Sequence, residues 1–127
     1  MSTIEIVTSS NAPAALGPYS QATVVNGVVY SSGQIGLIPE TGEFAGESAA
    51  EQAEQVLKNL QAVLAEAGTS MEKVFKTMIF LADINDFAAV NEVYASFFKE
   101  PYPARSCVQA GALPKNAKVE IEVIATL

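Results

Sequence analysis

Four residues near the C-terminus carry side chains that could do chemistry: Arg105, Cys107, Glu120 and Glu122. They lie in "PYPARSCVQAGALPKNAKVEIEVIATL", most of which alternates between apolar and polar residues as two strands of a sheet do. Arg105 is the only arginine of the chain. A guanidinium donates two parallel hydrogen bonds that match the two oxygens of a carboxylate. These residue types therefore indicate a site for a small carboxylate ligand.

Each of these residues also has an ordinary interpretation. Arg105 could be a surface or interface ion-pair partner, and Glu120 and Glu122 could be solvated residues on the outer face of an antiparallel strand. If one glutamate is partly buried, its pKa rises and it can orient or deprotonate a water molecule. The sequence leaves both interpretations open. Cys107 is more readily a small buried residue than a nucleophile, because the chain has no histidine to activate the thiol.

Two earlier segments supply polar groups of the kind that line small pockets. "GPYSQA" contains Tyr19, and "SSGQIG" contains Ser32 and Gly33, all of which are also ordinary turn and strand residues. The absence of histidine excludes a Ser-His-Asp triad and histidine metal ligands. No GxxxxGK[ST] or GxGxxG pattern is present. Chemistry in this chain must depend on carboxylate, guanidinium, hydroxyl, thiol and backbone groups.

The apolar pattern predicts the elements that position these residues. "QATVVNGVVYSSGQIGLI" contains two β-rich runs joined by Asn26-Gly27, the pair best suited to a type I′ turn, so we expect a hairpin. Residues 46–67 place apolar side chains at three- and four-residue steps, which predicts a helix that ends at Gly68. These apolar positions are Ala49, Ala53, Val56, Leu57, Leu60, Val63, Leu64 and Ala67.

The second half of the chain predicts a strand, a helix and two further strands. "VFKTMIFLADI" is the first strand, and Asn85 or Asp86 can cap the helix that follows it. The inward face of that helix is expected to hold Phe87, Val90, Tyr94, Phe97 and Phe98. In the last strand, Val119, Ile121, Val123 and Ala125 share one face, and Glu120, Glu122 and Ile124 the other. This order of elements predicts an α+β sandwich with two helices on one face of a sheet.

Five segments together resemble one known family over the whole length of the chain. They are "GPYSQA" (17–22), "SGQIGL" (32–37), "NEVYASFF" (91–98), "PARSCVQ" (103–109) and "LPKNAKVEIEVIA" (113–125). In this order and spacing they resemble the reactive intermediate deaminase family, called RidA or YjgF. The resemblance implies a chorismate-mutase-like α+β fold, with one mostly antiparallel sheet covered by two helices. It also implies a homotrimer with a barrel-like centre and pockets between subunits.

The family resemblance further implies an enzymatic activity. Family members hydrolyse reactive enamines and imines of 2-oxo acids, such as 2-iminopropanoate and 2-iminobutanoate, to the 2-oxo acid and ammonia. Their substrates arise from pyridoxal-phosphate enzymes, and no metal or organic cofactor is expected. The family has also been associated with RNA cleavage, chaperone-like holding and translation inhibition.

The resemblance assigns roles residue by residue. Arg105 matches the arginine that binds the substrate carboxylate, and Glu120 matches the glutamate that positions the attacking water. The remainder of the pocket is matched by Tyr19, Ser32 and the backbones of Gly33 and Cys107. Asn91 matches a motif residue without an assigned role, and Glu122 is not carried over as catalytic.

Composition narrows the remaining alternatives. The length of 127 residues predicts one domain, residues 1–127, and half of the residues are apolar, which indicates surface buried between subunits. The net charge of −7 disfavours nucleic acid and anionic membranes as partners. The N-terminal sequence lacks the pattern of a signal peptide, so we expect a cytoplasmic protein. The main rival function is a non-catalytic module that binds or senses a 2-oxo acid.

Overall fold

The computed structural model describes residues 3–127, so residues 1 and 2 of the expected domain lie outside the described residues. Two α-helices, α1 (Ala49–Ala67) and α2 (Phe87–Ala95), accompany seven strands. The strands are β1 (Glu5–Val7), β2 (Ala22–Val25), β3 (Val28–Ser31), β4 (Gln34–Ile35), β5 (Val74–Leu81), β6 (Ala104–Gln109) and β7 (Val119–Thr126). Short 3₁₀ turns are η1 (Met71–Lys73), η2 (Ile84–Asp86) and η3 (Pro114–Asn116).

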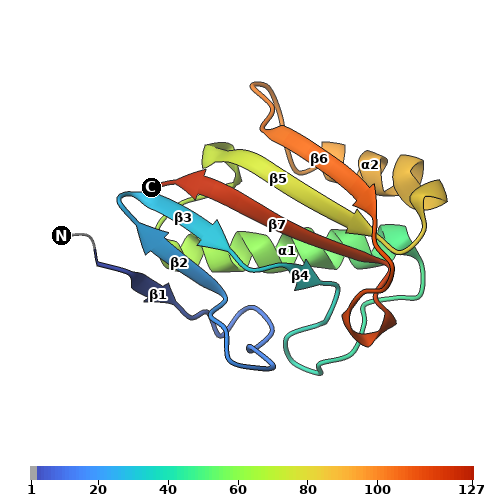
Figure 1. Ribbon diagram of the computed structural model, residues 1–127, viewed down its shortest axis with the longest axis horizontal. Coiled ribbons are helices and arrows are strands. Elements are labelled where there is room, and N and C mark those ends of the chain that lie inside the picture. Colours follow the sequence, from blue (N-terminus) through green and yellow to red (C-terminus); the bar gives the residue numbers. More distant parts are fainter. Residues whose placement is uncertain (1–2) are drawn as a thin grey trace.

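All strands belong to one sheet with the order β1-β2-β3-β7-β5-β6, and β4 pairs with β7 beside this path. Every pairing is antiparallel except that of β5 with β6, which is parallel. Both helices lie behind the same face of the sheet (Figure 1). The α+β fold with a mostly antiparallel sheet and two helices is therefore confirmed. Strand β1 was not predicted, because a three-residue strand is too short to show an alternating pattern.

The hairpin formed by β2 and β3 follows the sequence prediction. Val25 pairs with Val28, which leaves Asn26 and Gly27 as the two-residue turn. Their φ angles are 50° and 77°, and a type I′ turn requires positive φ at both positions. Asparagine and glycine tolerate this conformation at little steric cost.

Helix α1 begins three residues later than the apolar pattern predicted. Ser48 is the N-cap, its side chain accepts a hydrogen bond from the backbone N–H of Glu51, and the Glu51 side chain accepts one from the Ser48 backbone. This capping box satisfies N–H groups that the first turn leaves free. The helix ends as predicted at Gly68, whose φ of 91° is the left-handed conformation that glycine adopts readily. Its apolar face is buried against the sheet.

Helix α2 differs from its prediction in three details. Asp86 holds the N-cap position but makes no side-chain cap, and Asp83 instead accepts a hydrogen bond from the backbone N–H of Asn85. Val90 and Tyr94 are buried on the inward face as expected. The helix ends at Ala95, so the predicted Phe97 and Phe98 lie in the segment after it, where Phe98 is buried and Phe97 packs partly buried against the core. The assignment of Phe87 to the core was wrong: its side chain is 38% exposed and lies beside Arg105 instead.

The alternation predicted for β7 is confirmed. Four residues, Val119, Ile121, Val123 and Ala125, are buried in the core cluster between sheet and helices. Glu120, Glu122 and Ile124 occupy the opposite face and are partly exposed. Within residues 3–127, neither helix has the length and apolar character that crossing a membrane requires.

Candidate functional site

Four of the six predicted site residues line one cavity of about 360 Å³: Tyr19, Ser32, Gly33 and Glu120. The cavity lies where β4 and the start of β7 meet the loop before β2. Its other lining residues are Pro13, Ala14, Leu16, Gln21, Gln34, Ile35, Leu37 and Pro114. The cavity therefore combines an apolar wall with a hydroxyl, a phenol and one carboxylate.

Hydrogen bonds to the backbone hold the loops that form this cavity. The Ser32 hydroxyl donates to the carbonyl of Ser20 over 2.6 Å, and the Ser32 N–H donates to the carbonyl of Gln21 over 2.9 Å. The buried Gln21 amide accepts from the N–H of Ser9 and donates to the carbonyl of Pro13. The sequence analysis did not predict Gln21 as part of the site. Its position between Ser20 and the predicted strand was a signal that its amide could bind backbone groups of the adjoining loops. Its amide ties the N-terminal segment to the cavity wall.

Gly33 allows the Glu120 carboxylate to lie against the backbone of the loop between β3 and β4. A Cβ atom at position 33 would overlap the Glu120 carboxylate and would stand 2.8 Å from its Cδ atom. Ile35 of β4 pairs with Glu120 of β7, which fixes the two backbones side by side. The resulting close approach requires glycine.

The Glu120 carboxyl is the one acidic group in this cavity lining. Burial raises the pKa of Glu120 above the ordinary 4.5, and the negative charge of nearby Glu122 raises this pKa further. A carboxylate with a raised pKa is a stronger base once it is ionised. Of the two interpretations left open by the sequence, the partly buried one holds for Glu120.

Arg105 and Cys107 do not reach this cavity. They lie on β6, where Arg105 pairs with Thr77 and Cys107 pairs with Ile79 of β5. On the other side of β5, Thr77 pairs with Val123 of β7 and Ile79 pairs with Ile121. Both of these β7 residues are buried on the helix side of the sheet. Because side chains alternate along a strand, Arg105 and Glu120 lie on opposite faces of one sheet. A single chain does not bring the two groups together.

The Arg105 guanidinium rests on helix α2 through uncharged groups. Its Nη1 donates to Oδ1 of Asn91 over 2.6 Å, and its Cζ stands 4.9 Å from the Tyr94 ring centroid and 5.5 Å from that of Phe87. Within residues 3–127, no carboxylate forms an ion pair with Arg105, since the two ion pairs found there join Lys58 to Glu54 and Lys99 to Glu72. The ion-pair interpretation of Arg105 therefore finds no partner within the described chain.

Cys107 is a partly buried free thiol. Burial raises the pKa of Cys107, and the positive charge of Arg105 offsets part of this effect. The thiol form therefore dominates at neutral pH, as expected for a residue that is not a nucleophile. Within residues 3–127, no three histidine, cysteine or acidic side chains gather as metal ligands.

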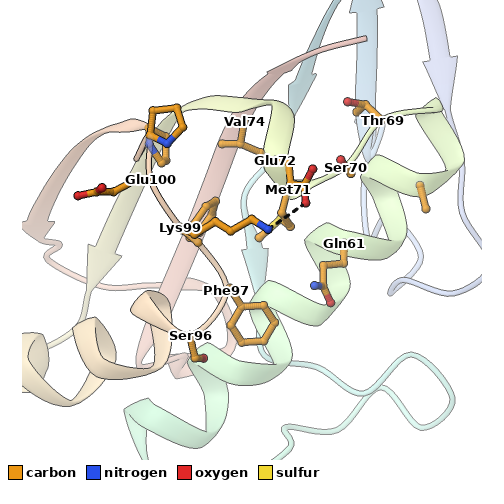
Figure 2. Close-up of a pocket in the computed structure, with 14 residues that line it drawn as sticks. Gln61, Thr69, Ser70, Met71, Glu72, Val74, Ser96, Phe97, Lys99 and Glu100 are labelled. Carbon is orange, nitrogen blue, oxygen red and sulfur yellow. Dashed lines mark ion pairs between the residues drawn. The ribbon is translucent and has the colours of Figure 1, made fainter.

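A larger cavity of about 800 Å³ lies elsewhere and contains none of the predicted site residues. It is bounded by the end of α1, by η1 and by the segment that follows α2. Figure 2 shows Lys99 reaching across it to Glu72, an exposed ion pair of 3.4 Å. Exposed pairs of this kind contribute little free energy. We therefore place the candidate chemistry in the smaller cavity, where the desolvated carboxylate lies.

Comparison with known proteins gives the class to which this fold and site belong. Residues 9–127 match the family model described as Endoribonuclease L-PSP. The chain is 57% identical over 123 residues to Reactive Intermediate Deaminase A, chloroplastic, of Arabidopsis thaliana, covering 97% of this chain and 66% of that protein. It is 47% identical over 120 residues to the human 2-iminobutanoate/2-iminopropanoate deaminase, covering 94% and 88%.

Solved structures agree with this class. RidA from the Antarctic bacterium Psychrobacter sp. PAMC 21119 superposes with a TM-score of 0.93 at 47% identity, covering 97% of this chain and 99% of that one. E. coli TdcF with bound serine superposes with a TM-score of 0.92 at 44% identity, covering 97% and 98%. The chain thus belongs to the RidA/YjgF family.

Proposed function

We propose that this protein hydrolyses the reactive imines of small 2-oxo acids, 2-iminopropanoate and 2-iminobutanoate, to the 2-oxo acid and ammonia. The observation that carries the proposal is the desolvated Glu120 carboxylate in a small, partly apolar cavity. The human relative is named for this activity, and the TdcF structure has bound serine, which also carries a carboxylate beside its nitrogen-bearing carbon. The same activity makes the chain an enzyme of the hydrolase class.

The proposed mechanism uses the charges that the chain itself supplies. Arg105 binds the substrate carboxylate through two N–H groups and so fixes the imine carbon. Glu120 accepts a proton from a water molecule as the water oxygen bonds to that carbon and the C=N double bond becomes single. Glu120 returns this proton to the nitrogen, which gives the tetrahedral carbinolamine. Glu120 then accepts the proton of the new hydroxyl group and passes it to the nitrogen as the C–N bond breaks, so ammonia leaves and the carbonyl forms. We propose no metal or organic cofactor for these steps.

The two charged residues come from different subunits in this proposal. Arg105 and Glu120 lie on opposite faces of the sheet, and β6 is an edge strand that a neighbouring copy can approach. The face opposite the helices carries apolar side chains, of which Tyr30 is 46% and Val108 is 42% exposed. Covering such a face favours association. We propose a homotrimer with a barrel-like centre, in which the cavity of one subunit receives β6 of the next.

The other matched residues complete the pocket of this proposal. Tyr19 and Ser32 line the cavity beside Gly33, and the backbone of Cys107 lies two residues from Arg105 on β6. We propose that these groups contact the substrate across the subunit boundary. We also propose that residues 1–127 form one domain and that the protein is cytoplasmic, and fractionation of cells would test the location.

A trapping assay tests the activity directly. A dehydratase or amino acid oxidase generates the imine, semicarbazide captures it, and the purified protein competes for it. We expect the wild type to lower the semicarbazone yield and Arg105→Ala to leave it unchanged. If no imine is consumed faster with the protein than without it, the proposed deaminase activity is wrong. The alternative function, a non-catalytic module that binds or senses a 2-oxo acid, then takes its place. If Arg105→Ala is fully active, the carboxylate clamp is wrong.

A further inference from the structure

Within residues 3–127, one face of helix α2 supplies the side-chain hydrogen bond and both ring contacts of the Arg105 guanidinium. Phe87, Asn91 and Tyr94 follow one another at steps of four and three residues, which places them on the same side of the helix. All three touch Arg105, by one hydrogen bond and two ring contacts. Helix α2 therefore has a role beyond covering the core.

Tyr94 is itself held in place by contacts to Thr77 and Phe98. Its hydroxyl and that of Thr77 are 2.9 Å apart in a buried hydrogen bond, and its ring lies 4.5 Å from that of Phe98. Thr77 is also the direct neighbour of Arg105 across the parallel strands. Burial raises the pKa of Tyr94, so the ring under the guanidinium is a neutral phenol at physiological pH. The Tyr94 side chain that supports Arg105 is thus buried, hydrogen-bonded and uncharged.

We propose that Asn91 and Tyr94 are positioning residues that hold the Arg105 guanidinium in its ligand-binding orientation through neutral contacts. Asn91 orients one amino group of the guanidinium, and the Tyr94 ring supports its plane. The inference rests on the proposed function, because the ligand it serves is a 2-imino or 2-oxo acid carboxylate.

Neutrality of the support is the essential property. A carboxylate at position 91 would stand at the same 2.6 Å from the guanidinium and form an ion pair with it. That ion pair would compete with the ligand carboxylate for the same N–H groups. An amide oxygen orients the guanidinium and leaves its charge for the ligand, which asparagine achieves and aspartate does not.

The chain offers a direct spectroscopic probe of this arrangement. Because Arg105 is the only arginine, protein labelled with ¹⁵N-arginine gives side-chain guanidinium signals from one residue. We expect Tyr94→Leu to move the Nε–H signal, since the ring current of Tyr94 is lost. We expect Asn91→Ala to merge Nη signals that are separate in the wild type, since rotation about the Nε–Cζ bond becomes faster. Unchanged signals in both variants would overturn the inference.

Ligand binding separates positioning from a merely structural role. The probe is 2-oxobutanoate, titrated by calorimetry into wild type, Asn91→Ala, Asn91→Asp and the matched control Glu92→Gln, which alters an exposed residue on the same helix. We expect affinity about tenfold weaker in Asn91→Ala, and weaker still in Asn91→Asp although its fold is retained. The control should bind as the wild type does.

Each result decides the matter. If Asn91→Asp binds 2-oxobutanoate as tightly as the wild type does, the requirement for a neutral support is wrong. Asn91→Asp also tests the role of Asn91 if Asn91→Ala does not fold. If the wild type binds 2-oxobutanoate and the variants weaken it, yet no imine is deaminated, the proposed activity fails while the positioning role stands. If the wild type does not bind 2-oxobutanoate, the positioning role for a carboxylate ligand fails.

Discussion

At the scale of single residues, the proposed reaction depends on the position of Glu120. Its carboxylate lies against Gly33 in the cavity, and both its burial and its neighbour Glu122 raise its pKa. A raised pKa means that folding favours the protonated form, so ionised Glu120 lowers stability as the pH rises through its folded-state value. The ionised form of Glu120 therefore lowers the free energy of unfolding, although the proposed reaction requires this form as a base.

The first prediction concerns pH. Because Glu120 must be ionised to accept a proton from water, the catalytic kcat/KM should fall at acid pH with a midpoint above 4.5. Glu122→Gln removes one cause of the raised pKa, so the midpoint should move to lower pH. Rates are measured at each pH after subtraction of uncatalysed imine hydrolysis. If the midpoint in Glu122→Gln is the same as in the wild type, Glu122 does not raise the pKa of Glu120. Glu92→Gln is the control and should keep the wild-type midpoint.

The second prediction concerns Gly33. In Gly33→Ala the new Cβ would meet the Glu120 carboxylate and displace it, so deaminase activity should fall by about a hundredfold. Gly111→Ala is the matched control, since a Cβ there meets no atom within 4 Å. Thermal melting checks that both variants fold. Wild-type activity in Gly33→Ala would show that the position of the carboxylate is not critical.

At the scale of elements, helix α1 holds the short strand β4 that forms one wall of the cavity. The buried Asn59 amide donates to the carbonyl of Leu37 over 2.9 Å, and the buried Gln52 accepts from the N–H of Lys118 over 2.8 Å. Leu37 lies after the end of β4 and Lys118 lies before the start of β7, so these two backbone groups are outside the strand ladder. Side-chain amides of the helix supply the hydrogen-bond partners of these backbone groups.

The third prediction tests this support. Asn59→Ala leaves the buried Leu37 carbonyl without its partner, so we expect the free energy of unfolding to fall by about 1–3 kcal/mol. Deaminase activity should also fall, because Ile35 and Leu37 line the cavity. Urea denaturation measures the first effect. As a control on the same helix, Glu54→Ala breaks only an exposed ion pair and should change stability by less than about 1 kcal/mol.

At the scale of the whole molecule, the sheet separates the two charged groups of the proposed site. Helices cover one face of the sheet (Figure 1), and the other face exposes apolar residues such as Tyr30 and Val108. In the proposed mechanism, a complete site therefore requires a second copy of the chain. The proposed subunit interface would bury part of the apolar surface of a small protein in which half of the residues are apolar.

The fourth prediction tests the shared site by subunit mixing. Arg105→Ala and Glu120→Gln should each be inactive alone. When equal amounts are unfolded and refolded together, one variant supplies Arg105 and the other Glu120, so random trimers should recover about one quarter of the wild-type activity. Sizing by light scattering checks the trimer. No recovery in properly assembled mixtures would place both residues in the site of one subunit.

The sequence by itself determined much of the fold and the chemistry. The alternation of β7, the Asn26-Gly27 turn and the stop at Gly68 depend on local sterics and periodicity, so they could be predicted without a structure. The missing histidines and the single arginine limited the chemistry in the same way. Phe87 was predicted in the core because the sequence pattern of an aromatic residue at helical spacing is the same whether its ring is buried or lies partly exposed beside Arg105.

Only the tertiary structure decided how the candidate residues are grouped. Strand pairing places Glu120 beside Gly33 and puts Arg105 on the opposite face, over Asn91 and Tyr94. Residues of α2 and β6 meet because β5 and β6 are parallel neighbours, and no local pattern encodes that pairing. The pKa of Glu120 likewise depends on its burial in a cavity built from distant segments. Local interactions determine the elements, and long-range packing determines the site.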